Sequence, residues 1–290
     1  MISIVTCSIN PKKLALLQQS LVETTFHPYE LIVIDNTEHK YSICSAYNFG
    51  ASKSKFEYLC FVHEDIIFKT QNWDINFINH FEKNANISLI GVVGNTVKTA
   101  FPSGVYSIVQ HTNRMNQLQA VLNEKPIHYY HNPKYEMHSE VATLDGMLLG
   151  TKKIFWQKYN FDDLTLMDFH GYDIDFSLAM AQLGKVVVVY DMLIEHASSG
   201  GNTVAWIESQ LKITKKWSAS LPVQIEADHK TLREREIDDL NQFAISLLRS
   251  RYSLKLAYQF CSLAFLRRPF QRINLFFLKH LMLQTFNGSG

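Results

Sequence analysis

Short apolar runs alternate with amphipathic segments over the first hundred residues of the chain. Runs such as ISIVTCS and LIVID are typical of buried strands, whereas the segments between them repeat apolar residues at helical spacing. The pattern predicts strands over residues 2–8, 29–36, 56–62 and 87–95, and helices over residues 10–23, 42–53 and 72–83. This alternation favours a Rossmann-like α/β fold with a doubly wound, mostly parallel sheet.

The pattern changes after residue 97. The next forty or so residues are polar and aromatic, which predicts a long loop or small hairpins of the kind that often acts as a lid. Further strands and helices follow, including a helix, a turn at Gly184 and one apolar strand that ends at His196. Everything beyond Asn202 has a helical pattern. We therefore expect a main domain over residues 1–205 and a helical, basic C-terminal extension over residues 206–290.

Polar residues stand at the ends of the first three predicted strands, over residues 6–10, 35–37 and 63–65. In doubly wound sheets the ligand crevice lies outside the carboxyl ends of the strands, so these ends should meet at one rim. The third end places Glu64 and Asp65 inside the otherwise apolar run YLCFVHEDIIF. Burying ionised carboxylates costs several kcal/mol unless a cation or another partner compensates. The sequence therefore indicates a cation at the rim, with a solvated strand end as the alternative.

The composition is that of an ordinary globular protein, with 47% apolar and 19% charged residues. The net charge of +1 conceals an asymmetry, because all 27 acidic residues precede Leu240 and seven basic residues follow it. The four cysteines are widely spaced, without a CxxC pair, which predicts reduced thiols in a cytoplasmic protein. We find no signal peptide at the N-terminus and no apolar run long enough to cross a bilayer.

The C-terminal extension alternates apolar and basic residues, and Pro269 should divide its last part into two helices. A basic, aromatic-rich amphipathic segment without acidic residues suits the anionic inner face of a plasma membrane. A helical pair packed on the main domain or on a partner subunit fits the pattern equally well. A nucleic-acid partner is not expected, because the rest of the chain is acidic.

The order of motifs resembles that of family-2-type glycosyltransferases with the GT-A fold. The stretches that carry the resemblance are ISIVTCSIN, LIVIDNT, FVHEDI, TLDGMLLGTKKIFW, and YDIDFSLAMAQLG followed by the strand with IEH. It covers roughly residues 1 to 200, and implies a nucleotide-sugar-binding and catalytic domain there. The resemblance implies that a nucleotide-diphosphate sugar lies along the rim, near Thr6, Ser8, Asp35, Asn36, His63, Glu64, Asp145 and Gly146. Asp35 would contact the base or ribose, and Asp145 would lie under the donor sugar; Asp35 could instead be only a turn or cap residue.

HEDI stands where this family has its metal-binding DxD motif, which makes Asp65 the expected ligand, with His63 in place of the first aspartate. His196 matches a histidine that completes the metal shell or touches the diphosphate, or else it is structural. Hard oxygen ligands suit Mg²⁺ or Mn²⁺, and imidazole favours Mn²⁺. The small turn from Ser198 to Gly201 could bring backbone amides to phosphate oxygens.

Asp173 matches the base that takes the proton from the acceptor hydroxyl in an inverting transfer, although Tyr172 replaces the usual glutamate before it. Asp173 and Asp175 could instead be acidic residues that favour a helix N-terminus. Trp156 is either an acceptor platform or a core residue. The histidines of HYYHNPKYEMH have spacings that could suggest zinc, but they lack a helical frame.

The resemblance thus implies a metal-dependent, inverting glycosyltransferase that acts on a glycan or lipid-linked acceptor, and by analogy a place in the assembly of bacterial surface polysaccharide or lipopolysaccharide. Two rival functions stay open at this point. One is a catalytically inactive nucleotide-sugar-binding scaffold of the same fold. The other is a nucleotidylyltransferase, although the segment PKKLALLQQS after the first strand has no glycine for the phosphate loop that such an enzyme needs.

Overall fold

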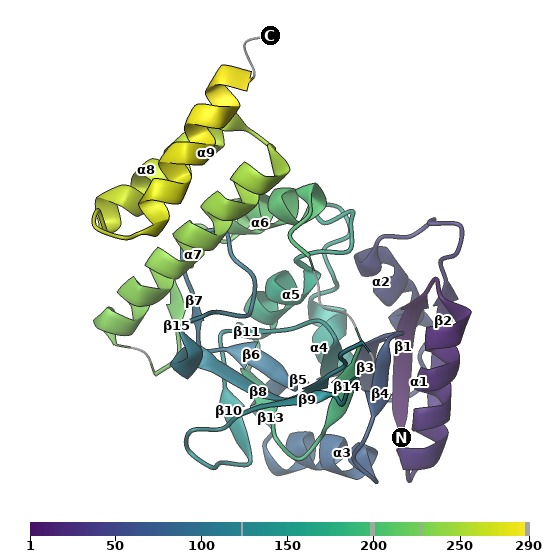
Figure 1. Cartoon of the computed structure of the whole chain (residues 1–290). Helices are drawn as coiled ribbons and strands as arrows, with labels where there is room; N and C mark the ends of the chain where they lie inside the picture. The colour runs from purple at the N-terminus through teal and green to yellow at the C-terminus, as the bar shows by residue number, and fades with distance from the viewer. Residues whose placement is uncertain (123, 198–200, 227, 288–290) are drawn as a thin grey trace.

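A seven-stranded sheet forms the centre of the computed structural model, which describes residues 1–122, 124–197, 201–226 and 228–287. Its strand order is β10-β13-β5-β12-β3-β1-β2. The strands are β1 (Ile2–Ser8), β2 (Glu30–Asp35), β3 (Tyr58–His63), β5 (Ile87–Gly91), β10 (His138–Glu140), β12 (Leu148–Lys152) and β13 (Lys185–Val189). β1 runs parallel to β2 and β3, and β13 runs parallel to β5, whereas β12 is antiparallel between β3 and β5. The expected mostly parallel α/β sheet is confirmed (Figure 1).

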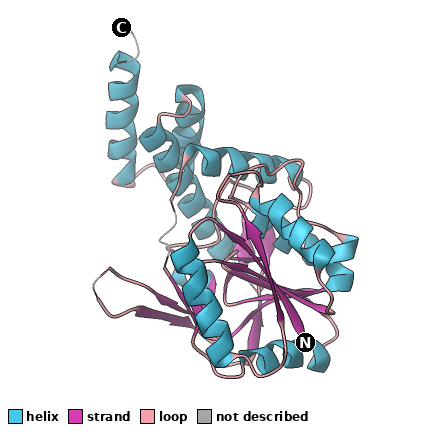
Figure 2. Ribbon diagram, turned by 90° about the vertical axis from the view of Figure 1, so that its right-hand side faces the viewer, coloured by secondary structure: helices cyan, strands magenta, loops and turns pink. Residues whose placement is uncertain are grey.

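Helices cover both faces of this sheet, as Figure 2 shows. They are α1 (Pro11–Thr24), α2 (Ile43–Lys53), α3 (Trp73–Lys83), α4 (Lys153–Lys158) and α5 (Tyr172–Met180). Successive side chains of a strand point to opposite faces. In β3, Leu59 and Phe61 pack with α2 and α5, whereas Cys60 and Val62 pack with α1 and α3. Both faces of the strand are therefore buried, which explains its uninterrupted apolar run.

A second, six-stranded sheet corrects two of the strand predictions. It contains β4 (Ile66–Phe68), β6 (Val93–Asn95), β8 (Asn113–Gln119), β9 (Ile127–His131), β11 (Thr143–Leu144) and β14 (Ile194–His196). The predicted strand 87–95 is β5 and β6, which belong to different sheets, and the strand predicted to end at His196 is β13 and β14. The first change occurs inside buried apolar sequence, so the hydrophobic pattern carries no sign of it, whereas the second follows Val189 at a bend where Asp191 interrupts the apolar run. The β8–β9 pair agrees with the small hairpins expected after residue 97.

The C-terminal part contains α6 (Val204–Lys216), α7 (His229–Ser250), α8 (Leu254–Arg267) and α9 (Ile273–Asn287). The prediction that everything beyond Asn202 is helical is wrong, because β15 (Val223–Gln224) pairs with β7 (Val97–Lys98). The break between α8 and α9 contains Pro269, as expected. Figure 1 shows α7, α8 and α9 beside one another at one end of the molecule.

α6 contacts both parts of the molecule. Ile213 belongs to the core cluster on the α2 and α5 side of the main sheet, whereas Ile207 packs with α7, α8 and α9. The division of the chain at residues 205 and 206 stays a prediction. Among the described residues, no helix combines the length and the apolar character that crossing a membrane requires.

Candidate active site

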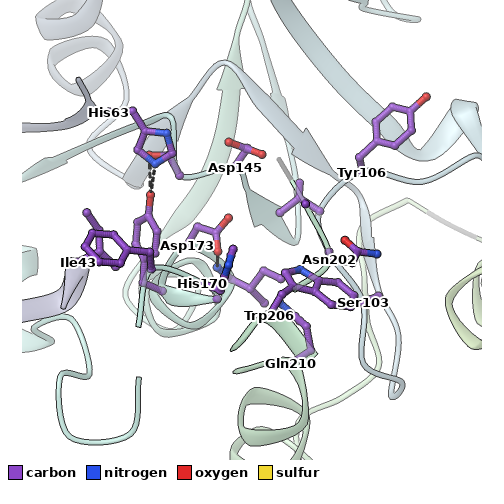
Figure 3. Close-up of a pocket in the computed structure, with 18 of the residues that line it drawn as sticks. Ile43, His63, Ser103, Tyr106, Asp145, His170, Asp173, Asn202, Trp206 and Gln210 are labelled. Carbon is purple, nitrogen blue, oxygen red and sulfur yellow. Dashed lines mark hydrogen bonds between the residues drawn. The ribbon is translucent and has the colours of Figure 1, made fainter. Parts of the chain in front are cut away.

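A cleft of about 780 Å³ opens at the carboxyl ends of the central strands. The register of the sheet places Ser8 beside Asp35 and Cys7 beside His63, so the three polar strand ends meet at one rim, as expected. Residues from β3, from the segment after β11, from α5 and from β14 line the cleft: His63, Glu64, Asp65, Asp145, Gly146, Tyr172, Asp173 and His196. Figure 3 shows His63, Asp145 and Asp173 turned toward this space.

His63, Asp65 and His196 form a group that can hold a metal ion. One ligand atom from each lies within 4.8 Å of the others. The His196 Nε2 atom is 3.4 Å from the Asp65 Oδ1 atom. That buried nitrogen has no hydrogen-bond partner among the described residues. A buried polar atom without a partner is costly, and a bound cation removes that cost, so the donor set fits a divalent ion.

Tyr172 fixes the orientation and the tautomer of His63. The Tyr172 hydroxyl donates to the carbonyl of Gly146 at 3.0 Å and lies 2.6 Å from His63 Nε2. Because the hydroxyl has one hydrogen, it can only accept from His63, which requires the proton on Nε2. Burial, with His196 nearby, lowers the pKa of His63 and keeps the ring neutral. The lone pair of Nδ1 therefore faces Asp65, 3.9 Å away, in the form that binds metals.

Asp65 is held in its ionised form. Burial by itself raises the pKa of this carboxyl, but the contacts with His196 and Lys13 lower it below its usual range. Lys13 of α1 approaches Asp65 Oδ2 at 3.2 Å, on the oxygen that does not face His196. The Oδ1 atom is thus left on the side of the two imidazoles. This arrangement agrees with the prediction that Asp65 is a ligand.

Glu64 has a different environment from Asp65. Its Oε2 atom accepts hydrogen bonds from the Ser8 hydroxyl at 2.7 Å and from the backbone amides of Ile9 and Asn10. The carboxylate therefore fastens the turn between β1 and α1. The predicted contacts of Glu64 and Ser8 with the nucleotide-sugar donor stay predictions. In the structure the two side chains are hydrogen-bonded to each other.

Three other residues that were predicted to contact the nucleotide-sugar donor do not line the cleft. Thr6 is buried within β1, and Asn36 is buried where its side chain bonds the backbone of Tyr41. Asp35 is exposed at the rim, and hydrogen bonds from the amide and hydroxyl of Thr37 lower its pKa. Of the three, Asp35 is the one whose carboxylate remains open to a ligand.

Asp173 and Asp145 face the cleft together. Burial and the neighbouring Asp145 carboxylate raise the pKa of Asp173 to about 7. A carboxyl group with such a pKa can accept a proton near neutral pH. Gly146 allows Tyr172 to pack against the segment after β11, since a Cβ atom there would lie 2.0 Å from the Tyr172 hydroxyl. The role of Asp173 as the base stays a prediction, with which its raised pKa agrees.

Asp175 belongs to the packing of α5. Its carboxylate accepts from the Trp217 indole at 2.7 Å and pairs with Lys216 at 2.8 Å, outside the cleft lining. Trp156 is also a core residue, with 8% of its surface exposed and its indole bonded to Asn48. Neither side chain is placed to touch a ligand in the cleft.

The histidines of the segment after β8 do not form a metal group among the described residues. His128 bonds Asn116, His131 bonds the backbone of Asn113, and His138 lies in β10. Of the turn predicted to bind phosphate, Ser198, Ser199 and Gly200 lie outside the described residues. Gly201 lines the cleft.

Among the described residues that line the cleft there is no lysine or arginine. Carboxylates, in contrast, line it from several segments: Glu64, Asp65, Asp145, Asp173, Asp238 and Asp239. An anionic ligand such as a diphosphate would be repelled here unless a cation accompanied it. Lys13 and Arg235 offset part of this charge from outside the lining, and the remaining carboxylates favour a diphosphate that is accompanied by a cation at the metal group.

Sequence reasoning missed the wall of the cleft opposite the metal group. Ser103, Tyr106, Trp206, Gln210 and Gln242 come from the segment after β7 and from α6 and α7. Trp206 and Gln210 lie in a segment with an amphipathic helix pattern. Any helix packed on a core has such a pattern, so the sequence gave no sign that these two residues line a cleft. Only the folding of α6 onto the rim brings them to the site.

The sheet topology and the strand-end cleft agree with the expected GT-A fold. A sequence model described as "Glycosyltransferase like family" matches residues 3–235. Because this is most of the chain, the protein belongs to that glycosyltransferase family, as its motifs suggest. No curated protein matches the chain.

The chain is also similar to solved glycosyltransferases at low sequence identity. The mannosyltransferase PcManGT of Pyrobaculum calidifontis, in complex with GDP-Man and Mn²⁺, is 11% identical, with a TM-score of 0.52, over 100% of this chain and 88% of its own. TarS 1–349 of S. aureus is 12% identical, with a TM-score of 0.46, over 99% and 92%. GalNAc-T7 with UDP, GalNAc and Mn²⁺ is 13% identical, with a TM-score of 0.49, over 68% and 43%, so the chain spans less than half of that protein.

Replacement of Tyr172 by Phe should weaken metal binding. The variant removes the hydroxyl that keeps the proton on His63 Nε2, and loss of such an outer contact typically costs about 10- to 100-fold in metal affinity. Titration of Mn²⁺ followed by the electron paramagnetic resonance of the free ion, with UDP or GDP present, measures the change. Tyr190→Phe, which removes a hydroxyl bonded to Ser139, is the control. Equal Mn²⁺ affinity of Tyr172→Phe and wild type would refute the tautomer assignment.

Proposed function

We propose that the protein is an inverting, metal-dependent glycosyltransferase. It moves a sugar from a nucleotide-diphosphate sugar to a hydroxyl of a glycan or lipid-linked acceptor. The observation that carries the proposal is that the metal-binding group of His63, Asp65 and His196 opens on the same cleft as Asp173. Mn²⁺ is the preferred ion, since two imidazoles suit it better than Mg²⁺, which prefers oxygen ligands throughout. PcManGT, which shares the fold, was solved with GDP-Man and Mn²⁺.

The side chains of the cleft divide the work of the transfer. His63, Asp65 and His196 would hold the ion, which when bound offsets the negative charge of the departing diphosphate. Asp173 takes the proton of the acceptor hydroxyl as its oxygen forms a bond to the anomeric carbon. The bond from that carbon to the diphosphate oxygen breaks on the opposite face, and its electron pair stays with the diphosphate. The configuration at the anomeric carbon is thereby inverted.

A donor nucleotide should stabilise the protein only together with Mn²⁺. At 100 times its dissociation constant a ligand adds about 2.7 kcal/mol, which corresponds to roughly 5 °C in Tm for a chain of this size. Thermal unfolding with UDP, GDP and their sugar conjugates, with and without Mn²⁺, measures this shift. Asp65→Asn should abolish it, whereas Asp35→Asn should reduce it without removing the dependence on Mn²⁺. No shift with any of these nucleotides would count against the proposal.

Asp173→Asn should lower turnover by about 10²- to 10⁴-fold, because the base is removed. The same variant should be more stable than wild type at pH 8. The pKa of Asp173 is raised to about 7 in the fold, so the ionised carboxylate opposes folding as the pH rises from about 4 to 7. Removing that charge should add a few kcal/mol at pH 8 and little at pH 4. For the wild type, kcat/KM should rise with pH and level off above about 7.

Asp175→Asn is the matched comparison on the same helix. It removes the charge that pairs with Lys216 and weakens the acceptor of the Trp217 indole, so it should lower stability while the folded fraction keeps its turnover. Denaturant unfolding at pH 4 and pH 8, with initial rates at several pH values, separates the two variants. Full turnover by Asp173→Asn would refute the role of this carboxyl as the base, whereas no turnover by the wild type would support the scaffold hypothesis.

We further propose that α8 and α9 attach the enzyme to an anionic membrane surface, at the inner face of a bacterial plasma membrane. Large apolar side chains are exposed along this pair: Tyr258, Phe265, Leu266, Phe270, Leu275, Leu278, Met282 and Leu283. Phe270 is 99% exposed, in the turn between the helices. Basic residues without any acidic residue accompany them after Leu240. This combination suits anionic lipid, and a lipid-linked acceptor for surface polysaccharide or lipopolysaccharide would be presented there.

Co-sedimentation with vesicles tests the membrane attachment. The protein should bind vesicles that contain phosphatidylglycerol and not vesicles of phosphatidylcholine alone. Leu266→Ser with Phe270→Ser should abolish binding without loss of Tm, since both side chains are exposed. Leu164→Ser, a change at an exposed leucine of the main domain, is the control. If the wild type instead forms a dimer that the double variant dissolves, the apolar surface is a subunit interface.

A further inference from the structure

The wall of the cleft opposite the metal group is held in place by buried charges. Asp238 of α7 accepts from the Ser107 hydroxyl at 2.7 Å and from the Ile108 amide, and Asp239 bonds the Thr99 hydroxyl. Arg235 pairs with Asp239 at 3.1 Å and is 0% exposed. These contacts join α7 to the segment 99–108, which forms the rim of the cleft. α7 thus helps to form the cleft.

Lys98 completes the charge balance of this wall. Its ammonium group is buried and donates to the Phe101 carbonyl at 2.7 Å and to the Ser103 hydroxyl at 2.9 Å. Two buried cations, Lys98 and Arg235, thereby accompany the two carboxylates of α7, and neither cation lines the cleft. The carboxylates of Asp238 and Asp239 are thus compensated from behind the wall, and the other groups of the wall, such as Ser103, Tyr106, Trp206 and Gln210, are uncharged.

Gln210 of α6 carries an unused acceptor that lines the cleft. Its side chain is 1% exposed, and its Oε1 atom has no hydrogen-bond partner among the described residues. A buried carbonyl oxygen without a donor is costly, and a hydroxyl group of a ligand would satisfy it. Figure 3 shows Gln210 with Trp206, Ser103 and Asn202 on the side of the cleft away from His63.

Trp206 supplies a flat apolar surface beside this acceptor. It is partly exposed and lines the cleft, while its ring packs on Phe243 with 6.1 Å between centroids. The other tryptophans of the chain, Trp73, Trp156 and Trp217, are buried. Aromatic rings with one face on the core and one face free bind the C–H face of a ligand without a large loss of conformational entropy.

We infer that Trp206 and Gln210, with Ser103 and Tyr106, form the binding site for an uncharged sugar ring of the acceptor. The inference rests on the proposed function and specifies its acceptor. The indole of Trp206 stacks on the sugar ring, and Gln210 Oε1 accepts from a sugar hydroxyl. Because the described lining holds no cation, a phosphorylated or carboxylated sugar finds no counter-charge at this wall. Asp173 lies between this wall and His63 in the view of Figure 3, where the acceptor hydroxyl must be deprotonated.

Intrinsic tryptophan fluorescence offers a direct test, because Trp206 is the tryptophan that a ligand in the cleft can reach. The protein with Mn²⁺ and UDP or GDP is titrated with methyl glycosides of glucose, galactose, mannose and N-acetylglucosamine, and with lactose and maltose. Glucuronate and glucose 6-phosphate are titrated in parallel. At least one neutral saccharide should change the emission saturably, and the charged sugars should bind at least tenfold more weakly. The change should disappear in Trp206→Phe.

Two variants of α6 separate recognition from packing. Gln210→Ala should weaken the saccharide response tenfold or more, whereas Lys212→Ala, at an exposed position of the same helix, should leave it unchanged. The thermal shift with Mn²⁺ and nucleotide, measured on the same samples, should persist in both. An absent shift in the wild type would defeat the proposed function itself. If the thermal shift is intact, three results would overturn the acceptor site alone. They are no response to any neutral saccharide, an unchanged response in Gln210→Ala, and tighter binding of a charged sugar.

Discussion

The concentration of negative charge in one cleft is the constraint on which the rest of this structure depends. Carboxylates reach the cleft from the end of β3, from the segment after β11 and from α5 and α7, and the described lining has no basic side chain. This charge favours a nucleotide diphosphate that enters together with a compensating cation. The group of His63, Asp65 and His196 provides the place for it. The lone pairs of that group depend in turn on Tyr172, which settles the tautomer of His63.

Stability and chemistry oppose each other at Asp173. The fold holds this carboxyl next to Asp145 and away from solvent, which raises its pKa to about 7. An ionised group in that position opposes folding, and the same displacement of the pKa makes it a useful base near neutral pH. Two residues along the helix, Asp175 has its charge matched by Lys216 and serves packing. The first turn of α5 therefore carries one carboxylate that destabilises the fold when ionised, Asp173, and one that stabilises it, Asp175.

The C-terminal helices contribute both to the cleft and to the surface proposed to bind the membrane. α7 fastens the segment 99–108 through Asp238 and Asp239, and α6 places Trp206 and Gln210 on the cleft. Farther along, α8 and α9 expose apolar and basic residues to the surroundings. An acceptor held at a membrane would thus meet helices that both approach the lipid and contribute to the acceptor side of the cleft.

The sequence by itself determined the sheet, the rim and the residues of greatest chemical interest. Short apolar runs and strand-end polarity are local properties, so β1, β2 and β3 and the position of Asp65 at the rim could be predicted, whereas Asp173 was indicated by the resemblance of its motif to a glycosyltransferase family. Only the tertiary structure decided what depends on contacts between distant segments. It directed Glu64 to the turn after β1, and it divided the strand predicted to end at His196 between two sheets. It also carried α6 to the rim, because a helix pattern indicates which face is apolar but not which neighbour that face will meet.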